Sequence, residues 1–438
     1  MKTVIMAGGK GTRISSVASD IPKPMIKIEN KPVLEHEIEC LRDQGFTDLI
    51  ITVSHLGHII MDYFGDGSKI SPVTGKSFGV NIEYFVEEVP LGNAGALFQL
   101  KDKLSEDFLL LNADSIFDID FNRLVEYHKE KGGLVTLFTH PNNHPYDSGL
   151  IFADENNAVL AWLAKEDPRP EFYRNRVNAG LHVLNKKVLD VEIDTPKIDL
   201  DRQILKPLAG TGKMFAYDSP EYVKDMGTPE RYEAVCKDYR DGKVTSKNFT
   251  NKQKAIFLDR DGTINKYVGF LRNIDDFELI DGVSEAIRKI NASGYLAIVI
   301  TNQPVVARGE VTFRELEEIH NKMETLLGKE GAYIDGLYFC PHHPDKGFEG
   351  EVPELKFDCD CRKPKTGLLE RAKIQYNIDL GSSWLIGDAT IDIKTGINAG
   401  CSTVLVKTGT KGEDGKYDVK ADFVADSLLD AVNIILKQ

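Results

Sequence analysis

Short apolar runs alternate with amphipathic segments along the whole chain, and this alternation limits the possible folds more than any other feature. In the first half the runs have the length and composition of buried strands, and they lie at residues 3–7, 49–53, 108–112 and 135–138. Helical patterns at residues 33–44 and 121–131 lie between them. Strands that alternate with helices indicate an α/β fold with a largely parallel sheet, because each helix returns the chain to the same edge of the sheet.

A polar segment divides this pattern in two. Residues 241–253, DGKVTSKNFTNKQ, contain few apolar side chains, and a new buried-strand run follows at residues 255–258. Further strand-like runs at 296–300, 384–386 and 403–406 alternate with helical patterns at 313–327, 368–376 and 428–436. A chain of 438 residues has room for two or three domains. We therefore expect two α/β domains, at residues 1–240 and 254–438, joined by a linker at 241–253.

Charge and hydropathy exclude several classes of protein. The chain has 54 Lys and Arg against 68 Asp and Glu, and the resulting formal charge of −14 would repel a polyphosphate backbone. No apolar run approaches the roughly 18 residues that a membrane span needs. The run at residues 4–7 ends at Gly8-Gly9 without a signal-cleavage pattern. We expect a cytoplasmic protein that binds neither nucleic acid nor membranes; its oligomeric state, a homo-oligomer included, stays open.

A glycine-rich loop follows the first predicted strand. Residues 3–7 lead directly into GGKGTR at residues 8–13, and glycines let backbone N–H groups approach phosphate oxygens that a Cβ atom would block. Pro22-Lys23-Pro24 follows, and its rigid neighbours could present the lysine ammonium group to a departing pyrophosphate. Each motif alone is equally consistent with an ordinary turn. Together they favour a site for a nucleoside triphosphate.

Three motifs in this order resemble the sugar-1-phosphate nucleotidyltransferases: AGGKGTR at 7–13, DIPKPM at 20–25 and LGNAGAL at 91–97. The resemblance covers nearly all of residues 1–240 and implies a Rossmann-like domain with a mixed sheet. It also implies that Arg13 and Lys23 act in catalysis by stabilising the released pyrophosphate. The implied nucleotide-binding residues are Gly8, Gly9, Gly11, Thr12 and Gly92.

The same resemblance assigns two metal-binding aspartates, Asp114 in LLLNADSIFD and Asp225 in DMGTP. Two separated carboxylates suit this chemistry, because Mg²⁺ must bridge the α-phosphate and the leaving group while charge builds between them. A turn or helix-cap role is the alternative for either residue. On the sugar side, the resemblance places Lys165 at the sugar phosphate and Asn178 on the ring. The chain reads Ala-Lys-Glu at 164–166, where the family usually has Glu-Lys-Pro.

Two carboxylates two residues apart end the first strand-like run of the second half. Asp259 and Asp261 in DRDGT lie on one face of an extended chain. A carboxylate nucleophile with a neighbouring acid/base can divide phosphate-ester hydrolysis into two easier steps. A calcium loop or a turn is the alternative for this pair alone.

Further motifs follow the DRDGT sequence in the order found in the haloacid dehalogenase-like phosphatases, which this half resembles. They are Thr301-Asn302, Arg362-Lys363-Pro364 and Gly387-Asp388. The resemblance implies that Asp259 is the nucleophile and Asp261 the general acid/base. It places Thr301, Asn302, Arg362 and Lys363 at the substrate, and Mg²⁺ at Asp259, Asp261 and Asp388.

A cysteine-rich stretch supplies a second set of metal ligands. Cys340 and His342 lie in FCPHHP, and Cys359 and Cys361 lie in CDCRKP. Three thiolates and one imidazole fill the four positions of a tetrahedral Zn²⁺ ion, which favours a structural site over a catalytic one. Buried free thiols are the alternative. Across about residues 254–410, this set closely resembles the D-glycero-D-manno-heptose-1,7-bisphosphate 7-phosphatases. Histidinol-phosphate phosphatases share the zinc-bearing scaffold and are the nearest alternative for this domain.

The two halves together predict consecutive reactions. In the first half, SSVASDIPKPM at 15–25 and EEVPLGNAG at 87–95 look most like heptose-1-phosphate guanylyltransferases. We predict that one chain removes the 7-phosphate of heptose 1,7-bisphosphate and then transfers a nucleotidyl group from GTP to heptose 1-phosphate. Pro304, Val305 and Ala389 depart from the phosphatase pattern and leave its exact specificity open.

Two alternatives remain at this stage. The first is a hexose-1-phosphate uridylyl- or cytidylyltransferase fused to a histidinol-phosphate or other sugar phosphatase. The second is a chain in which one domain is a catalytically dead binding module. The second alternative predicts lost carboxylates, yet both halves keep theirs: Asp114, Asp225, Asp259, Asp261 and Asp388.

Overall fold

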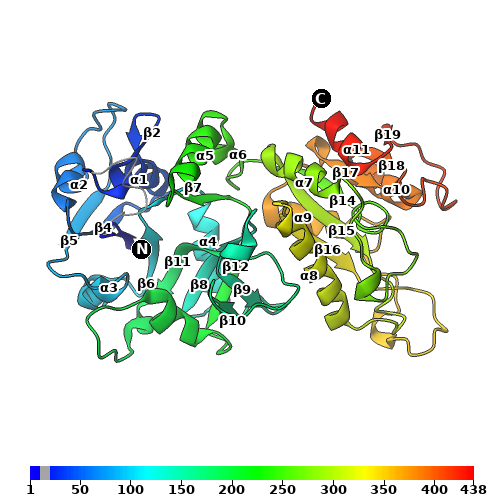
Figure 1. Cartoon of the computed structure of the whole chain (residues 1–438), viewed down its shortest axis with the longest axis horizontal. Helices are drawn as coiled ribbons and strands as arrows, with labels where there is room; N and C mark the ends of the chain where they lie inside the picture. Colours follow the sequence, from blue (N-terminus) through cyan, green and yellow to red (C-terminus); the bar gives the residue numbers. More distant parts are fainter. Residues whose placement is uncertain (10–19) are drawn as a thin grey trace. The chain divides into compact units, whose positions relative to one another are not determined.

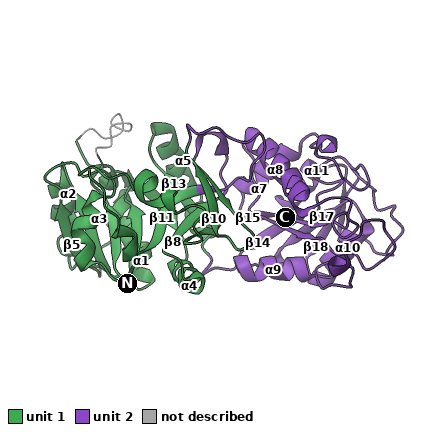
Figure 2. Cartoon of the chain, turned by 90° about the horizontal axis from the view of Figure 1, so that it is seen from below, with its two compact units in different colours: residues 1–140, 149–164, 178–248 green, residues 141–148, 165–177, 249–438 purple. Residues whose placement is uncertain are grey.

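The computed structural model describes residues 1–9 and 20–438 and divides the chain into two compact units (Figures 1 and 2). Unit 1 comprises Met1–His140, Gly149–Ala164 and Asn178–Asn248. Unit 2 comprises Pro141–Ser148, Lys165–Val177 and Phe249–Gln438. Two short segments from the first half of the sequence therefore belong to the second unit. The segment expected to be a linker contains a short helix, α6 (Lys243–Ser246).

Among the described residues, unit 1 is built around a nine-stranded sheet whose main path is β10-β9-β11-β6-β1-β4-β5, with β8 and β12 attached through β11. Strands β6, β1, β4 and β5 are parallel, whereas β11 runs antiparallel to β6, so the predicted mixed sheet is confirmed. The strands are β1 (Thr3–Met6), β4 (Asp48–Val53), β5 (Asn81–Val86), β6 (Asp107–Asn112), β8 (Val135–His140), β9 (Leu150–Ala153), β10 (Val159–Leu163), β11 (Val177–Asn185) and β12 (Met214–Asp218).

Apolar side chains cover both faces of this sheet, which explains why its central strands read as continuous apolar runs. In β1, Ile5 belongs to the cluster that includes the apolar faces of α1, α2 and α4, and Val4 belongs to the opposite cluster with α3. The helices are α1 (Val33–Asp43), α2 (Gly57–Phe64), α3 (Gly95–Leu100), α4 (Phe121–Lys131) and α5 (Pro229–Arg240). Helix α4 begins where the Asp120 side chain accepts from the Arg123 N–H and ends at Gly132 with φ +64°.

Two small sheets complete unit 1. Strands β2 (Lys27–Ile28) and β3 (Lys31–Pro32) form a short antiparallel pair. Strand β7 (Ser115–Asp118) follows β6 almost directly and pairs antiparallel with β13 (Tyr222–Asp225). This second pair brings the end of the unit 1 sequence next to the residues that follow β6.

Unit 2 contains a six-stranded, fully parallel sheet among its described residues, in the order β16-β15-β14-β17-β18-β19. The chain starts in the middle of the sheet at β14, extends to one side and then returns to the other, as in doubly wound folds. The strands are β14 (Lys254–Leu258), β15 (Tyr295–Asn302), β16 (Gly336–Cys340), β17 (Trp384–Gly387), β18 (Ser402–Val406) and β19 (Phe423–Ala425). The predicted Rossmannoid arrangement is confirmed.

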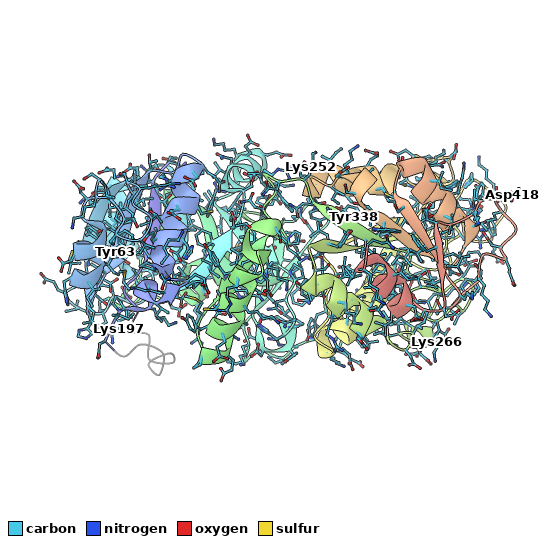
Figure 3. The ribbon with its side chains drawn as sticks, turned by 90° about the horizontal axis from the view of Figure 1, so that it is seen from above. Tyr63, Lys197, Lys252, Lys266, Tyr338 and Asp418 are labelled. Atoms are coloured by element: carbon cyan, nitrogen blue, oxygen red, sulfur yellow. The ribbon has the colours of Figure 1, made fainter. Side chains whose placement is uncertain are left out.

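Helices cover both faces of this second sheet. Ile256 and Leu258 of β14 pack into the cluster that includes residues of α7, α8 and α11, whereas Phe257 faces the cluster with α9. The helices are α7 (Val283–Ala292), α8 (Phe313–Lys329), α9 (Gly367–Tyr376), α10 (Thr390–Ala399) and α11 (Leu428–Ile435). The hydroxyl of Tyr338 in β16, labelled in Figure 3, donates to Gln375 Oε1 of α9 at 2.6 Å. None of the helices in the described part of the chain is both long and apolar enough to cross a membrane.

Gly92 is required by a close backbone approach. Its φ is +81°, and a Cβ atom would lie 2.3 Å from the carbonyl oxygen of Ile198, far inside van der Waals contact. Gly75 also has a positive φ, +69°, but a Cβ atom there would meet nothing within 4 Å. Alanine at Gly75 would therefore incur only the cost of the left-handed backbone conformation, whereas alanine at Gly92 would also incur the cost of the clash.

We predict that Gly92→Ala destabilises unit 1 much more than Gly75→Ala. The left-handed conformation costs about 1–2 kcal/mol in either variant. The clash at Ile198 adds about 1–3 kcal/mol in Gly92→Ala alone. Urea unfolding followed by circular dichroism measures both, and equal losses would contradict the close approach at Ile198.

Candidate active sites

The first candidate site lies at the carboxyl ends of the parallel strands of unit 1, where α/β sheets bind ligands. Gly8 and Gly9 follow β1 after Ala7, and the Gly8 carbonyl accepts a hydrogen bond from the hydroxyl of Ser54, just after β4, at 2.7 Å. A Cβ atom on Gly8 would lie 3.2 Å from Glu87 Oε1, just after β5. The predicted residues Gly11, Thr12 and Arg13 lie outside the described residues.

The structure brings the two predicted metal aspartates of unit 1 together. Asp114 follows β6, and the pairing of β13 with β7 places Asp225 opposite Ser115. The Met226 N–H then donates to the Asp114 carbonyl at 3.1 Å. Lys23 Nζ donates to Asp114 Oδ2 at 2.9 Å, so one predicted catalytic residue joins this group. The backbones of the two aspartates therefore lie side by side, while the Asp225 carboxylate accepts from Arg231 Nη1 at 2.8 and 3.1 Å.

A third carboxyl group near Asp114 is missing from the sequence prediction. Glu37 of α1 is fully buried. Burial, together with the nearby negative charge of Asp114, raises the pKa of Glu37 well above its usual value. Both effects favour the uncharged form of the Glu37 carboxyl group over the charged one. Glu37 lies within the helical pattern at residues 33–44, and nothing in that pattern indicates that its side chain lies near Asp114.

The predicted sugar-side residues belong to different units. Asn178 in β11 is half-buried, and its Oδ1 accepts from the Gly180 N–H at 3.2 Å. Gly180 has φ +75°, and a Cβ atom there would lie 2.6 Å from Asn112 Nδ2 at the end of β6. Lys165 belongs to unit 2, where its exposed ammonium group lies 3.5 Å from Asp147 Oδ2.

The second candidate site lies at the carboxyl ends of three adjacent strands in unit 2. Asp259 follows β14, Asp388 follows β17, and Thr301 and Asn302 end β15. Lys363 reaches this edge from a loop that Asn302 holds in place. The Lys363 N–H donates to Asn302 Oδ1 at 3.0 Å, and Asn302 Nδ2 donates to the Lys363 carbonyl at 3.3 Å.

A buried ammonium group links two carboxylates at this edge. Lys363 Nζ donates to Asp259 Oδ1 and to Asp392 Oδ1, each at 2.6 Å. All three side chains are buried, and carboxylate oxygens of Asp259, Asp388 and Asp392 lie within 4.8 Å of one another. Asp392, in the first turn of α10, is absent from the predicted ligand set. Three carboxyl groups against one ammonium group leave an excess of negative charge, which fits a divalent cation.

The same burial shifts the proton affinities of these groups. Burial raises the pKa of Asp259 to about 7 and that of Asp388 to about 6, and it also raises the pKa of Asp392. Burial alone would lower the pKa of Lys363, but the charges of Asp259 and Asp392 raise it above its usual value. Lys363 therefore stays protonated and holds the nucleophile candidate in place.

Two glycines leave room for the Asp388 carboxylate. A Cβ atom on Gly262, where φ is +85°, would lie 2.7 Å from that carboxylate. A Cβ atom on Gly409 would lie 2.1 Å from Asp388 Oδ2. The Thr410 N–H donates to the same oxygen at 2.5 Å and fixes its direction. A side chain at position 262 in DRDGT would therefore clash with the Asp388 carboxylate, which explains the glycine and which the motif alone does not reveal.

Asp261, also a predicted metal ligand, is not part of the group formed by Asp259, Asp388 and Asp392. Its carboxylate accepts two hydrogen bonds from Arg260 Nη2, at 2.9 and 2.8 Å, one from Gln303 Nε2 at 2.8 Å and one from Asn265 Nδ2 at 3.0 Å. Arg260 is fully buried, and its Nη1 lies 3.1 Å from His320 Nε2. The sequence prediction assigned no role to Arg260. Its place between two aspartates was the available signal, because a buried arginine needs a carboxylate partner.

The four predicted thiolate and imidazole ligands lie together. Cys359 Sγ is 3.5 Å from Cys340 Sγ and 3.3 Å from Cys361 Sγ, and His342 Nδ1 is 3.6 and 3.3 Å from the sulfurs of Cys340 and Cys361. Sulfur ligands about 2.3 Å from a tetrahedral zinc ion would be about 3.8 Å apart, so the set fits such an ion after small shifts. Arg362 follows directly, and its Nη1 donates to the His342 carbonyl at 3.2 Å.

Comparisons with known proteins divide the chain in the same way as its motifs. A family model described as nucleotidyl transferase matches residues 2–242, and a model described as HAD-hydrolase-like matches residues 360–431. The D-glycero-beta-D-manno-heptose-1,7-bisphosphate 7-phosphatase of Escherichia coli strain K12 is 42% identical over 185 residues. These cover 42% of this chain and 94% of that protein.

Two solved structures match one half of the chain each. HddC from Yersinia pseudotuberculosis, complexed with GMP-PN, is 27% identical, with a TM-score of 0.45, and the match covers 54% of this chain and 99% of that chain. The D,D-heptose 1,7-bisphosphate phosphatase from B. bronchiseptica, complexed with magnesium and phosphate, is 30% identical, with a TM-score of 0.37. That match covers 42% of this chain and 99% of the other.

The buried ion group of unit 2 generates a stability prediction. Lys363→Met should destabilise unit 2 by about 3–5 kcal/mol, because it leaves buried carboxyl groups without their cation. The double variant Lys363→Met/Asp392→Asn should regain part of this stability, because it leaves one fewer buried carboxylate without a cationic partner. Urea unfolding measures both variants.

The matched control is Lys365→Met, two residues further on. Lys365 is about half exposed, pairs with Asp358 at the surface and donates to the Cys359 carbonyl at 2.8 Å, so its loss should cost far less stability than the loss of the buried Lys363. If Lys363→Met and Lys365→Met unfolded at the same urea concentration, the structural role of the buried ion group would be refuted.

Proposed function

The chain belongs to the nucleotidyl transferase family through residues 2–242 and to the HAD-like heptose-bisphosphate phosphatases through its second half, and on this premise we propose consecutive steps of GDP-heptose synthesis. It is a bifunctional enzyme, with a nucleotidyltransferase and a phosphatase in one polypeptide. The observation that carries the substrate assignment is the 42% identity over 94% of the length of a heptose-bisphosphate phosphatase. The buried Asp259–Lys363–Asp392 group supports hydrolysis by a carboxylate nucleophile.

In the proposed phosphatase reaction, an Asp259 oxygen attacks the phosphorus of the 7-phosphate. The bond from phosphorus to the sugar oxygen breaks, and Asp261 gives that oxygen a proton. Asp261 then takes a proton from water, whose oxygen attacks the phosphorus of the aspartyl phosphate. The bond from phosphorus to the Asp259 oxygen breaks, which releases inorganic phosphate and restores the Asp259 carboxylate. Lys363 orients Asp259 throughout, because its ammonium group donates to Oδ1 at 2.6 Å.

Metal ions complete both sites in this proposal. In unit 2, Asp259 and Asp388 would hold Mg²⁺, which supplies positive charge for the phosphoryl oxygens. In unit 1, Asp114 and Asp225 would hold Mg²⁺ in the same role. The Cys340, His342, Cys359 and Cys361 set would hold Zn²⁺ as a closed structural site.

In the proposed transferase reaction, a phosphate oxygen of heptose 1-phosphate attacks the α-phosphorus of GTP. The bond from the α-phosphorus to the bridging oxygen breaks, and pyrophosphate leaves. Lys23, which lies at Asp114, and Arg13 stabilise the charge on pyrophosphate. The phosphatase product is a sugar 1-phosphate, which is the substrate that the transferase requires, and this match supports the order of the two reactions. The guanine base rests on the motif resemblance at residues 15–25 and 87–95.

The ligand set predicts about one Zn²⁺ per chain. Cys359→Ser should lose the metal and lower the melting temperature of unit 2 by roughly 10 °C, because structural zinc contributes directly to folding. Metal analysis and calorimetry provide the two measurements. Cys401→Ser is the matched control, because Cys401 is a buried thiol of the same unit outside the four-ligand set, and it should keep the zinc. Wild-type protein without zinc would contradict the proposal.

The two reactions can be separated with isosteric variants. Given heptose 1,7-bisphosphate, GTP and Mg²⁺, the wild type should release phosphate and pyrophosphate and accumulate GDP-heptose. Asp259→Asn removes the nucleophile and should make none of these products from the bisphosphate, yet it should form GDP-heptose from heptose 1-phosphate at close to the wild-type rate. Asp114→Asn should release phosphate normally and reduce GDP-heptose formation by orders of magnitude.

Failure of each variant has a separate meaning. A wild type that ignores the bisphosphate would refute the heptose assignment, and histidinol phosphate would then be the next substrate to test. An Asp259→Asn variant that is inactive with heptose 1-phosphate as well would refute the independence of the two sites.

A further inference from the structure

A buried chain of polar side chains runs from Asp261, the candidate acid/base of unit 2, to helix α8. Arg260 lies between the two aspartates of DRDGT, and its side chain is fully buried. Its Nη2 donates to both carboxylate oxygens of Asp261, at 2.9 and 2.8 Å. Its Nη1 lies 3.1 Å from Nε2 of His320 in α8, which is 6% exposed. The guanidinium group therefore links Asp261 to a buried histidine 60 residues further along the chain.

The direction of the contact between Arg260 and His320 follows from the chemistry of the two side chains. A guanidinium group carries donors and no acceptor, so Arg260 Nη1 donates and His320 Nε2 accepts. A neutral imidazole ring has one acceptor nitrogen, whereas a protonated ring has none. Burial and the positive charge of Arg260 lower the pKa of His320 well below its usual value. Both effects favour the neutral ring, which is the form that can hold Arg260.

Two amide side chains hold the same carboxylate from other segments. Gln303 Nε2 donates to Asp261 Oδ2 at 2.8 Å and to Thr301 Oγ1 at 2.8 Å, and Asn265 Nδ2 donates to Asp261 Oδ1 at 3.0 Å. Each carboxylate oxygen thus accepts one hydrogen bond from Arg260 and one from an amide group. This arrangement restricts rotation of the Asp261 carboxylate, and Arg260 connects the restraint to α8.

Packing alone does not account for an arginine at this position. The Arg260 Nε atom is buried and has no hydrogen-bond partner among the described residues, which is a costly state for a polar group. An apolar side chain of similar volume would avoid this cost. The Asp261 side chain is 19% exposed, so solvent also reaches it. A role in fixing the direction of the Asp261 carboxylate explains why a guanidinium group is kept here.

We propose that His320 is a positioning residue for the phosphatase, which holds Arg260 and thereby fixes the Asp261 carboxylate for proton exchange with the sugar oxygen. The inference rests on the proposed hydrolysis, in which Asp261 protonates the leaving oxygen. A general acid contributes about 10²- to 10⁴-fold to a rate, and this contribution depends on its placement. Loss of the His320 acceptor should therefore slow the reaction without removing any group that contacts the substrate.

The leaving group distinguishes this role from a general structural one. The sugar oxygen of the 7-phosphate needs a proton as it leaves, whereas p-nitrophenolate is stable as an anion near neutral pH. The ratio kcat/KM reports the steps up to departure of the leaving group. A misplaced Asp261 should therefore lower kcat/KM for heptose 1,7-bisphosphate much more than kcat/KM for p-nitrophenyl phosphate.

The test measures phosphate release by the full-length protein from each substrate in the presence of Mg²⁺. His320→Asn removes the acceptor from the Nε2 position, whereas His320→Gln can place an amide oxygen close to it. The Asn variant should lower kcat/KM for the bisphosphate by about tenfold or more, and that for p-nitrophenyl phosphate by less than about twofold. The Gln variant should keep both within about threefold of the wild type. Glu317→Gln, on the exposed side of α8, is the matched control and should change neither.

A wild-type kcat/KM for the bisphosphate in His320→Asn would overturn the inference, as would equal losses with both substrates. If the wild type does not hydrolyse p-nitrophenyl phosphate, the contrast between the Asn and Gln variants decides, and equal losses in the two variants would overturn the inference. Should His320→Asn fail to fold in urea titrations, Arg260→Lys takes its place, because lysine keeps the charge but lacks the planar fork that reaches both partners. An unchanged kcat/KM in Arg260→Lys would likewise overturn the inference.

Asp261→Asn tests the proposed function separately. If this variant kept the wild-type kcat/KM for the bisphosphate, Asp261 would not be the acid, and the proposed mechanism would fail together with the inference. If Asp261→Asn lost activity while His320→Asn kept it, the proposed function would stand and the role of His320 alone would be refuted.

Discussion

The ammonium group of Lys363, held between the buried carboxylates of Asp259 and Asp392, is the interaction on which the second unit depends. It determines how the loop that contains Lys363 must run, because Asn302 holds the backbone of that lysine from the end of β15. It also leaves Asp388 as a further buried carboxyl group without an ammonium partner of its own. The excess negative charge favours binding of a cation, and a divalent ion would offset two of the negative charges.

In the first unit a lysine is also paired with an aspartate at the candidate site, but the carboxylates there are less buried. Lys23 and Asp114 are paired at the edge of the sheet, and Asp225 reaches the same place through the pairing of β13 with β7. The carboxylates of Asp114 and Asp225 are partly exposed, whereas those of unit 2 are buried. A more exposed site costs less to desolvate and suits a reaction in which a large nucleotide brings its own charge and metal.

Much of the fold could be predicted because its central strands are buried on both faces. Residues 255–258, for example, read as a continuous apolar run, and β14 spans Lys254–Leu258. Asp259 and Asp388 could also be predicted, since each directly follows such a run. Asp392 follows Asp388 by about one helical turn, but this spacing alone does not assign it to the site, because an acidic residue in the first turn of a helix is common for reasons of helix electrostatics. The roles of Arg260 and Glu37 depend on contacts between distant parts of the sequence, which no local pattern records.

The placement of Lys165–Val177 in unit 2 bears on how such a chain could be assembled or divided. A cut between Asn248 and Phe249 separates the two sequence families, but it leaves Asn175 and Arg176 on one fragment and Glu324 on the other. A stand-alone transferase would have to shorten this connection or supply other partners for its polar groups. Joining two genes end to end would therefore leave these polar groups without partners unless the sequences around Asn175 and Glu324 also matched each other.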